Sequence, residues 1–512
     1  MSHAETSARP IRPRQRRQSR VEWMPRGPLG ERGSDRVGEG FAAHDVRWGL
    51  VRVRLWRIVA TLIVSGAVSA GCTHPAPAGG IPVPTTPPMG WNSWNSGIHM
   101  TQQSVRATID ALVASGMRDA GYRYVNLDAG WAAPTRDAAG HLQADPDTFP
   151  DGMAALARYA HDRKMLLGLY ASPYNQSCGQ DPRTASAGHE TADAQTFAAW
   201  GIDYLKYDWC STDADHADQV RIFTAMRDAL RATGRRIIYS INPNGPGHPF
   251  AGSSYDWSAI ADMTRNTIDL LPVWANPPAA EVDGSLSSDD FMGVREQVAA
   301  AAPTVAHSRP GHWNDPDMLV VGITWPEFVK GHPNKLWKLA LAGTLTPHQV
   351  DQIYHVLPLT PDVVGLIGAQ RPSLTDAEQR AHFSLWAMLG APLLAGNDIR
   401  TMLQTTRAIL TNREIIAVDQ DPLVRQATAL TQDSRVMVKP LADGSVAVAL
   451  VNSTDHPEST STTAADTGLP AAPCYIVRDL WAHTTSTTTG DIHSEGIPAH
   501  GIAVLRVTPT CP

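Results

Sequence analysis

The chain has 512 residues, which is enough for two or three domains with a sizeable core. Apolar residues make up 43% of it and charged residues 18%, a composition typical of soluble globular proteins. The formal net charge is −7, so we expect no nucleic-acid partner.

The N-terminal part has the composition of an extension followed by an export signal. Residues 1–50 are rich in arginine and show no sustained apolar period, which indicates a disordered extension or a stretch upstream of a true start at Met24 or Val51. Residues 51–72 combine arginines, an apolar run over 58–68 and small residues, as a signal peptide does. The apolar run is too short to span a bilayer.

Two fates of this signal stay open. Cleavage after Ala70 would give a secreted protein, whereas cleavage before Cys72 would give a lipoprotein anchored to the membrane by a lipid on that cysteine. Residues 73–86 are rich in proline and predict an extended linker.

The chain has five cysteines, a number that suits an exported protein with disulfides. If Cys72 is removed or acylated, four remain to pair. Cys474 and Cys511 both lie in the C-terminal segment and favour one bridge there, which leaves Cys178 and Cys210 to join two loops of the larger domain. Four free thiols are the alternative.

Strand-like and helix-like segments alternate from residue 87 to about 424. The predicted strands cover residues 89–94, 122–131, 165–172, 203–210, 236–243, 261–269, 311–319 and 391–398. Helical periods, such as those over 105–117 and 218–234, lie between most of them. Eight strands alternating with helices predict an α/β fold, a parallel (β/α)₈ barrel of the triosephosphate-isomerase type, with an open doubly wound sheet as the alternative.

Polar or aromatic side chains stand at the C-terminal end of each predicted strand. They are Trp94, Asp128, Tyr170, Asp208, Asn242, Asp269, Asp317 and Asp398. This is the face on which such barrels carry their chemistry. Histidines are not found there in metal-ligand spacing and no glycine-rich phosphate loop follows a strand, so we expect no metal and no other cofactor.

The remaining chemistry suits a carbohydrate substrate. Glycosidases need two carboxyl groups on either side of a sugar, with hydrogen-bonding and aromatic groups around it. Asp208 and Asp269 can supply the carboxyls, and Lys206 and Arg265 lie near them in sequence. From about residue 425 to 512 the helical period gives way to Val-rich alternation with Gly, Asp and Thr turns, which predicts an antiparallel β-sandwich with a structural or carbohydrate-contacting role.

Six motifs carry a specific resemblance. They are "PPMGWNSW" (87–94), "KYDWC" (206–210), "RNTID" (265–269), "WNDPDML" (313–319), "APLLAGNDIR" (391–400) and "IIAVDQDPL" (415–423). The residues of these motifs and their order along the chain resemble those of glycoside hydrolase family 27, the family of α-galactosidases and α-N-acetylgalactosaminidases. The family's fold, a (β/α)₈ barrel followed by an antiparallel sandwich, agrees with the architecture predicted from the strand pattern.

The resemblance implies a catalytic mechanism. Asp208 falls on the family's nucleophile and Asp269 on its acid/base, in a retaining double displacement that requires the two carboxyls to lie about 5–5.5 Å apart. Lys206 would donate to the sugar's O3 and O4, and its charge would favour the ionised form of Asp208. Arg265 would hold the 2-hydroxyl.

The resemblance also implies further contacts and a disulfide. The remaining substrate-binding positions that it carries over are Trp94, Asp128, Tyr170, Asn242, Asp317 and Met318. Asp317 is expected chiefly to organise its neighbours, and Asp398 to be structural. Cys210 would pair with Cys178 in the family's active-site disulfide.

The sequence departs from the family where the sugar is selected. The α-galactosidases usually have paired acids at the end of strand two, as in "LDDCW", whereas "LDAGW" here keeps Asp128 and places Ala129 and Gly130 next to it. A lost charged hydrogen bond to O4 or O6 is worth roughly 1.5–3 kcal/mol. We expect an α-galactosidase; the alternatives are a β-L-arabinopyranosidase or an isomaltodextranase-like enzyme.

Two other functions are disfavoured, and the roles of one insertion and of oligomerisation stay open. The loop 240–249 lacks the small residues expected around an N-acetyl group, which disfavours an α-N-acetylgalactosaminidase. A secreted carbohydrate-binding protein without activity is disfavoured because both candidate acids are present. Residues 323–372 form an insertion that could be a lid, an aglycone subsite, an oligomer contact or a plain surface loop, and the oligomeric state stays open.

Overall fold

The structure is a computed structural model that describes residues 84–178, 182–210, 215–245, 250–275, 291–331 and 372–510. The predicted extension, the signal with Cys72, most of the linker, Cys511 and most of the insertion lie outside these residues. Within the described ranges, no helix is long and apolar enough to cross a membrane.

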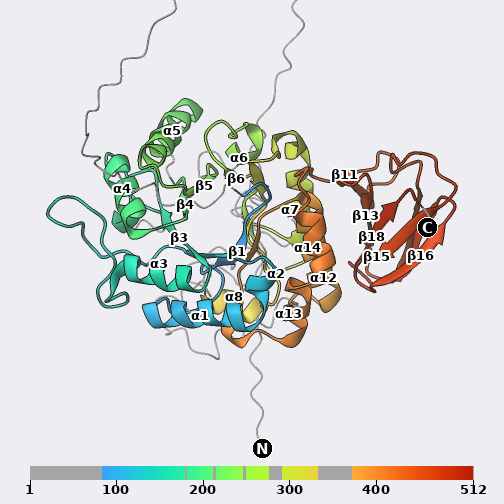
Figure 1. Ribbon diagram of the computed structural model, residues 1–512, viewed down its shortest axis with the longest axis horizontal. Coiled ribbons are helices and arrows are strands. Elements are labelled where there is room, and N and C mark those ends of the chain that lie inside the picture. Colours follow the sequence, from blue (N-terminus) through green and yellow to red (C-terminus); the bar gives the residue numbers. More distant parts are fainter. Residues whose placement is uncertain are drawn as a thin grey trace, which may run out of the picture. The chain divides into compact units, whose positions relative to one another are not determined.

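Eight parallel strands form the wall of a barrel, and all eight strands predicted from the sequence are present (Figure 1). They are β1 (Met89–Asn92), β2 (Tyr124–Leu127), β3 (Leu166–Ala171), β4 (Tyr204–Asp208), β5 (Ile238–Asn242), β6 (Met263–Arg265), β9 (Trp313–Asp315) and β10 (Leu393–Ala395). Their order is β10-β1-β2-β3-β4-β5-β6-β9. The Leu319 N–H donates to the Leu394 carbonyl at 2.8 Å and Gly396 N–H to the Leu319 carbonyl at 3.0 Å, which joins the two ends of the sheet.

Helices follow the strands and cover the barrel. They are α1 (Gln102–Ala114), α2 (Met117–Ala120), α3 (Gly152–Asp162), α4 (Glu190–Trp200), α5 (His216–Ala232), α6 (Ala251–Ser254), α7 (Val294–Ala301), α8 (Trp325–Gly331), α12 (Asp376–Leu389), α13 (Gln404–Leu410) and α14 (Arg413–Asp419). The predicted stripe of α1 is buried at Val105, Ile109 and Leu112, and Thr101 begins the helix with a capping box. Short 3₁₀ turns lie at η1 (Pro182–Thr184), η3 (Ala302–His307) and η6 (Ile399–Thr401).

The inward-facing side chains of the barrel form layers, because side chains alternate across a strand. On β4 the alternation places Tyr204 below Lys206 and Lys206 below Asp208. The lowest layer is apolar and packs together from several strands, with Tyr124 and Tyr204 rings 5.9 Å apart. This layer closes the barrel from below, so that the polar layers above it open only toward the C-terminal ends of the strands.

One predicted strand ends earlier than expected. The sequence placed Asp269 at the end of strand six, but β6 stops at Arg265 and Asp269 begins the separate strand β7 (Asp269–Leu270), which pairs with β8 (Phe291–Met292). The residues between Arg265 and Asp269 are buried. One of them, Asn266, donates a hydrogen bond from its side chain to Thr304 Oγ1 at 2.7 Å. Asp269 therefore reaches the barrel mouth from a loop.

The C-terminal residues form two antiparallel sheets, as predicted. The larger has the order β11-β12-β13-β18-β15-β16 and the smaller pairs β14 with β17. Their bounds are β11 (Thr428–Ala429), β12 (Val436–Pro440), β13 (Val446–Val451), β14 (Glu458–Thr463), β15 (Tyr475–Asp479), β16 (Thr484–Thr488), β17 (Asp491–Ile497) and β18 (Ile502–Thr508). Their apolar faces share one core, to which Val448 and Leu450 of β13 and Ile492 of β17 belong.

Candidate active site

A pocket of about 330 Å³ opens at the C-terminal ends of the strands. All ten residues predicted to catalyse or bind substrate line it: Trp94, Asp128, Tyr170, Lys206, Asp208, Asn242, Arg265, Asp269, Asp317 and Met318. They come from seven of the eight barrel strands or the loops after them, and from β7. Asp398 is not among the lining residues, and its carboxylate pairs instead with Arg400 at 2.7 Å.

Lys206 stands between two carboxylates. Its ammonium lies 2.8 Å from Asp128 Oδ2 and 3.3 Å from Asp208 Oδ2, and it lies over the Tyr170 ring at 5.4 Å. The three charged side chains are largely buried, so a lysine in this strand is compensated by two acids. Among the residues that the structure describes, none forms a hydrogen bond with the second oxygen of Asp208, Oδ1, which is buried.

Burial and charge act in opposite directions on Asp208. Burial raises the pKa of Asp208 to about 6, Lys206 lowers it, and Asp128 raises it. The expected effect of Lys206 is therefore present, but desolvation outweighs it. For Lys206 burial alone would lower the pKa, yet Asp128 and Asp208 raise it well above its ordinary value, so this lysine stays charged.

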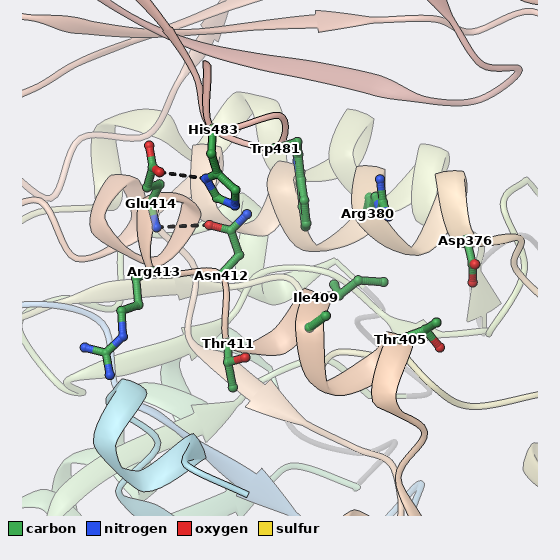
Figure 2. Close-up of a pocket in the computed structure, with 11 residues that line it drawn as sticks. Asp376, Arg380, Thr405, Ile409, Thr411, Asn412, Arg413, Glu414, Trp481 and His483 are labelled. Carbon is green, nitrogen blue, oxygen red and sulfur yellow. Dashed lines mark hydrogen bonds and ion pairs between the residues drawn. The ribbon is translucent and has the colours of Figure 1, made fainter. Parts of the chain in front are cut away.

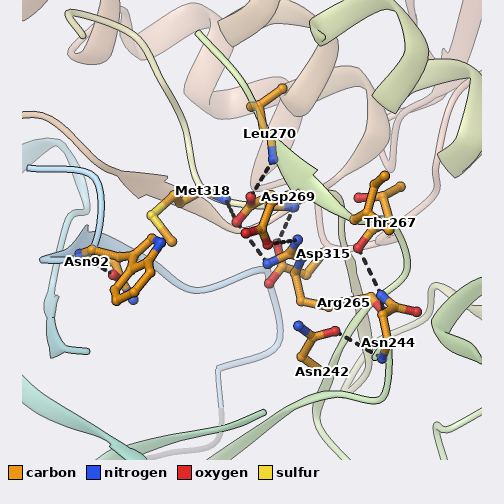
Figure 3. Close-up of polar contacts among 12 residues, drawn as sticks. Asn92, Asn242, Asn244, Arg265, Thr267, Asp269, Leu270, Asp315 and Met318 are labelled. Carbon is orange, nitrogen blue, oxygen red and sulfur yellow. Dashed lines mark hydrogen bonds and ion pairs between the residues drawn. The ribbon is translucent and has the colours of Figure 1, made fainter. Parts of the chain in front are cut away.

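Arg265 pairs with two acids, of which Figure 3 labels Asp269. Its guanidinium lies 3.0 Å from Asp317 Oδ1 and 3.3 Å from Asp269 Oδ1. Arg265 and Asp317 are buried, whereas the Asp269 side chain is 41% exposed. Burial would lower the pKa of Arg265, but the carboxylates of Asp317 and Asp269 raise it. The more exposed acid thus stands at the mouth of the pocket beside a fixed cation.

Asp317 adopts a backbone conformation that is rare for its residue type. Its φ of 82° lies in the left-handed region, where Asp is tolerated better than most non-glycine residues. Its Oδ2 accepts from the Leu270 N–H at 2.8 Å, and its carbonyl accepts from Trp386 Nε1 at 2.8 Å. Leu270 follows Asp269 in β7, so Asp317 touches the pocket and also positions the strand that carries Asp269.

Two amides set the wall next to Arg265. Asn242 Oδ1 accepts from the Asn244 N–H at 3.1 Å, and Asn244 Nδ2 donates to the carbonyls of Arg265 and Thr267 at 3.1 and 2.9 Å. Figure 3 shows this chain of contacts beside the Arg265 side chain. Trp94 also lines the pocket and is 39% exposed.

The predicted disulfide between Cys178 and Cys210 is present, with Cα atoms 4.9 Å apart. It ties the loop after β3 to the residue two positions after Asp208. Nearby, the Ser172 hydroxyl donates to the Asp208 carbonyl at 3.1 Å. Cys474 is also disulfide-bonded, whereas Cys511, its expected partner, lies outside the described residues.

Several residues of the pocket were not predicted from the sequence. Asn95, Ser177 and Arg183 line the pocket from loops after β1 and β3, and loop residues give no periodic signal. Asp315 was not predicted either; it pairs in register with Arg265, and burial raises the pKa of Asp315 to about 6. Asp315 lies inside the "WNDPDML" motif, and its alternation with Trp313 could have shown that it faces inward.

Comparisons with known proteins agree with this geometry. The model of the family described as alpha galactosidase A matches residues 86–335 and 360–421, and the model of the alpha galactosidase C-terminal beta sandwich domain matches residues 431–507. Alpha-galactosidase A of Cellvibrio japonicus is 34% identical over 444 residues, which cover 83% of this chain and 92% of the relative. The alpha-galactosidase of Cyamopsis tetragonoloba is 34% identical over 428 residues, covering 83% of this chain and 86% of the relative.

Solved structures share the fold. Alpha-galactosidase I of Mortierella vinacea is 29% identical, with a TM-score of 0.67, over 84% of this chain and 98% of the other. A family 27 β-L-arabinopyranosidase of Geobacillus stearothermophilus is 21% identical, with a TM-score of 0.64, over 83% and 97%, a likeness that concerns the fold alone.

Cleavage of a glycosidic bond requires two carboxyl groups around one sugar, and Asp208 and Asp269 line a single pocket at the end of the barrel where such folds carry their chemistry. Together with the matched relatives, this defines the class of the protein as glycoside hydrolase. With both domains matched in order, the chain belongs to glycoside hydrolase family 27, the α-galactosidase family.

Proposed function

We propose that the protein is a retaining exo-α-galactosidase that releases terminal α-D-galactosyl residues from oligo- or polysaccharides. The observation that carries the proposal is that Asp208 and Asp269 line one pocket together with Lys206 and Arg265. The curated relatives named alpha-galactosidase support the choice of galactose.

The two acids have environments that suit different roles. In the first step Asp208 attacks the anomeric carbon, the bond to the leaving oxygen breaks, and Asp269 gives its proton to that oxygen. In the second step a water gives its proton to Asp269 and attacks the same carbon, which frees Asp208. The enclosed Asp208 beside the Lys206 ammonium suits a nucleophile, and the more exposed Asp269 suits exchange of protons with water.

The binding groups support an exo-acting enzyme. The pocket is closed below by the apolar layer of the barrel, so that only the end of a sugar chain can enter it. Lys206 can donate to hydroxyls of the glycone, and Arg265 can hold the hydroxyl next to the anomeric carbon. Trp94 at the rim can pack on an apolar face of the sugar.

One observation favours a second candidate function. Ala129 lines the pocket at the position of the second of the paired acids of the α-galactosidases, and Gly130 lines it at the position of their cysteine. A β-L-arabinopyranoside lacks the C6 hydroxymethyl group of galactose. Because no second carboxylate binds O4 or O6 here, galactose gains less affinity over the arabinopyranoside than it would with the paired acids. The enzyme would then act on both glycones.

The test is a panel of aryl α-D-galactoside, aryl β-L-arabinopyranoside, aryl α-D-glucoside and dextran. We expect the galactoside to give the highest kcat/KM. Strong action on another member with none on the galactoside would overturn the choice of substrate. Asp208→Asn should lower kcat roughly 10³-fold or more, while the control Asp398→Asn should stay active.

Azide separates the two acids. With Asp208→Gly, azide can enter the space of the missing carboxylate and attack the anomeric carbon, so a β-galactosyl azide should form. With Asp269→Gly, azide should intercept the glycosyl-enzyme and give the α-galactosyl azide. Nuclear magnetic resonance distinguishes the two products, and exchanged products or the same anomer from both variants would overturn the assignment of roles.

A further inference from the structure

A second cavity of about 480 Å³ lies between helices α12, α13 and α14 and the turn that follows β15. It shares no lining residue with the active-site pocket and is the larger of the two. Its volume falls within the range of about 300–1,000 Å³ that is typical of ligand sites. The residues of this cavity, which we call the lateral cavity, have no part in the catalytic steps.

One wall of the lateral cavity is fixed by a hydrogen-bonded frame. Asn412 caps α14 by accepting from the Glu414 N–H at 3.0 Å, and its Nδ2 donates to the Leu480 carbonyl at 3.0 Å. Glu414 also accepts from Arg478 at 2.7 Å and lies 2.6 Å from His483 Nδ1. The cavity is therefore preformed, and a ligand would not have to order this wall.

The lateral cavity combines an apolar surface with polar groups (Figure 2). Trp481 is half-buried and its Nε1–H donates to Ser384 Oγ at 2.9 Å, which fixes the indole plane. Ile409 is buried below it. Figure 2 shows Trp481, Arg380 and Asp376 along one side of the cavity, with Ile409 and Thr405 on the opposite side.

The polar groups balance in charge. Arg380 and Arg413 contribute two positive charges, and Asp376 and Glu414 contribute two negative charges. Within the part of the chain that the structure describes, the side chains of Asp376 and Thr405 have no hydrogen-bond partner. Such a set favours a neutral ligand with many hydroxyl groups and an apolar face, because carboxylates accept, guanidinium groups donate and a hydroxyl does both.

We propose that the lateral cavity is an auxiliary carbohydrate-binding site that holds a segment of the polysaccharide while the active site acts on its ends. A saccharide has the hydroxyls for Asp376, Arg380 and Thr405 and an apolar face for the Trp481 indole. The proposal rests on the glycoside hydrolase function only for the choice of ligand class.

The experiment measures binding and hydrolysis separately. Migration in a native gel that contains galactomannan reports binding, and an inactive Asp208→Asn background prevents the polymer from being cut. In this background we compare Trp481→Ala, which removes the indole, with Ala408→Trp, which fills the cavity from an exposed position on α13 without removing a contact. Arg407→Ala, an exposed arginine on α13 outside the lining, is the matched control.

We expect both cavity variants to weaken galactomannan retardation at least threefold, and the control to leave it unchanged. With Asp208 restored, the same variants should lower kcat/KM on galactomannan several-fold and leave kcat/KM on an aryl galactoside unchanged. If Trp481→Ala does not fold, Ala408→Trp alone decides. The proposal is overturned if galactomannan retards the Ala408→Trp variant as strongly as its Asp208→Asn parent, or if it does not retard the parent at all. Inactivity on aryl galactosides would overturn only the proposed function.

Discussion

Neutralising Asp128 should make the enzyme more tolerant of acid. Burial raises the pKa of Asp208 to about 6, and the charge of Asp128 contributes to that rise. As the proposed nucleophile, Asp208 can act only when it is ionised, so kcat/KM of the wild type should fall as pH drops through about 6 and be about tenfold lower at pH 5 than at pH 7. Removing a charge that raises this pKa must move the fall to lower pH.

The size of the effect follows from the geometry. Asp128 Oδ2 lies 2.8 Å from Lys206 Nζ, which lies 3.3 Å from Asp208 Oδ2. The two carboxylates are thus within about 6 Å of each other, and at an effective dielectric constant near 20 their repulsion is roughly 2–3 kcal/mol. In Asp128→Asn the midpoint should fall by about one to two pH units, since about 1.4 kcal/mol corresponds to one unit. Lys206→Met should move it in the opposite direction.

The assay is the pH profile of kcat/KM on an aryl α-galactoside, with Asp398→Asn as the control. Asp398 pairs with Arg400 away from the pocket, so its neutralisation should leave the midpoint where it is. A midpoint that stays or rises in Asp128→Asn would refute the charge coupling and with it the view that Asp208 limits activity in acid. The absolute rates will fall in both pocket variants, but the position of the midpoint does not depend on them.

Ala129→Asp should raise the ratio of kcat/KM for aryl α-galactoside over aryl β-L-arabinopyranoside about tenfold or more, because a charged hydrogen bond to a sugar hydroxyl is worth roughly 1.5–3 kcal/mol; an unchanged ratio would show that this position does not face O4 or O6. Asp317→Ala breaks a buried ion pair and should lower the free energy of unfolding by about 3–5 kcal/mol, whereas Arg221→Ala, which loses an exposed pair, should change it far less. Replacing Cys178 and Cys210 together by serine opens a link between residues 32 apart and should lower the free energy of unfolding by about 3–4 kcal/mol. Equal denaturation curves for this variant and the wild type would contradict it, and a reductant should destabilise the wild type at least as much, because it also opens the bridge of Cys474.

The sequence predicted the barrel because its pattern is local. Each strand is a short apolar run bounded by turns, and each is found where expected, although β6 is shorter than the segment 261–269. The C-terminal sheets were predicted from Val-rich strands such as β13. The strands β14 and β16 were not predicted. Their sequences, "ESTSTT" and "TTSTT", consist almost wholly of polar residues that lie largely exposed and show no apolar alternation.

The site residues were predicted from the family motifs more than from side-chain periodicity or charge. Asp208 follows from a strand-end acid and from the resemblance, and both place it in the pocket. Arg183 and Asn95 had no such signal, since their positions depend on how loops fold over the barrel mouth. The pairing of Arg265 with Asp317 joins residues 52 positions apart, which no local pattern reveals.

By itself the sequence determined the class of fold and the family and pointed to two candidate acids, because these depend on side-chain periodicity and on short motifs. Only the tertiary structure decided that burial outweighs the charge of Lys206 in setting the pKa of Asp208. It also decided that Asp317 accepts a hydrogen bond from the strand that contains Asp269, and that a lateral cavity forms between the helices and the turn after β15. Solvation and the distances between charges are properties of the folded chain, since they arise only when segments far apart in sequence pack together.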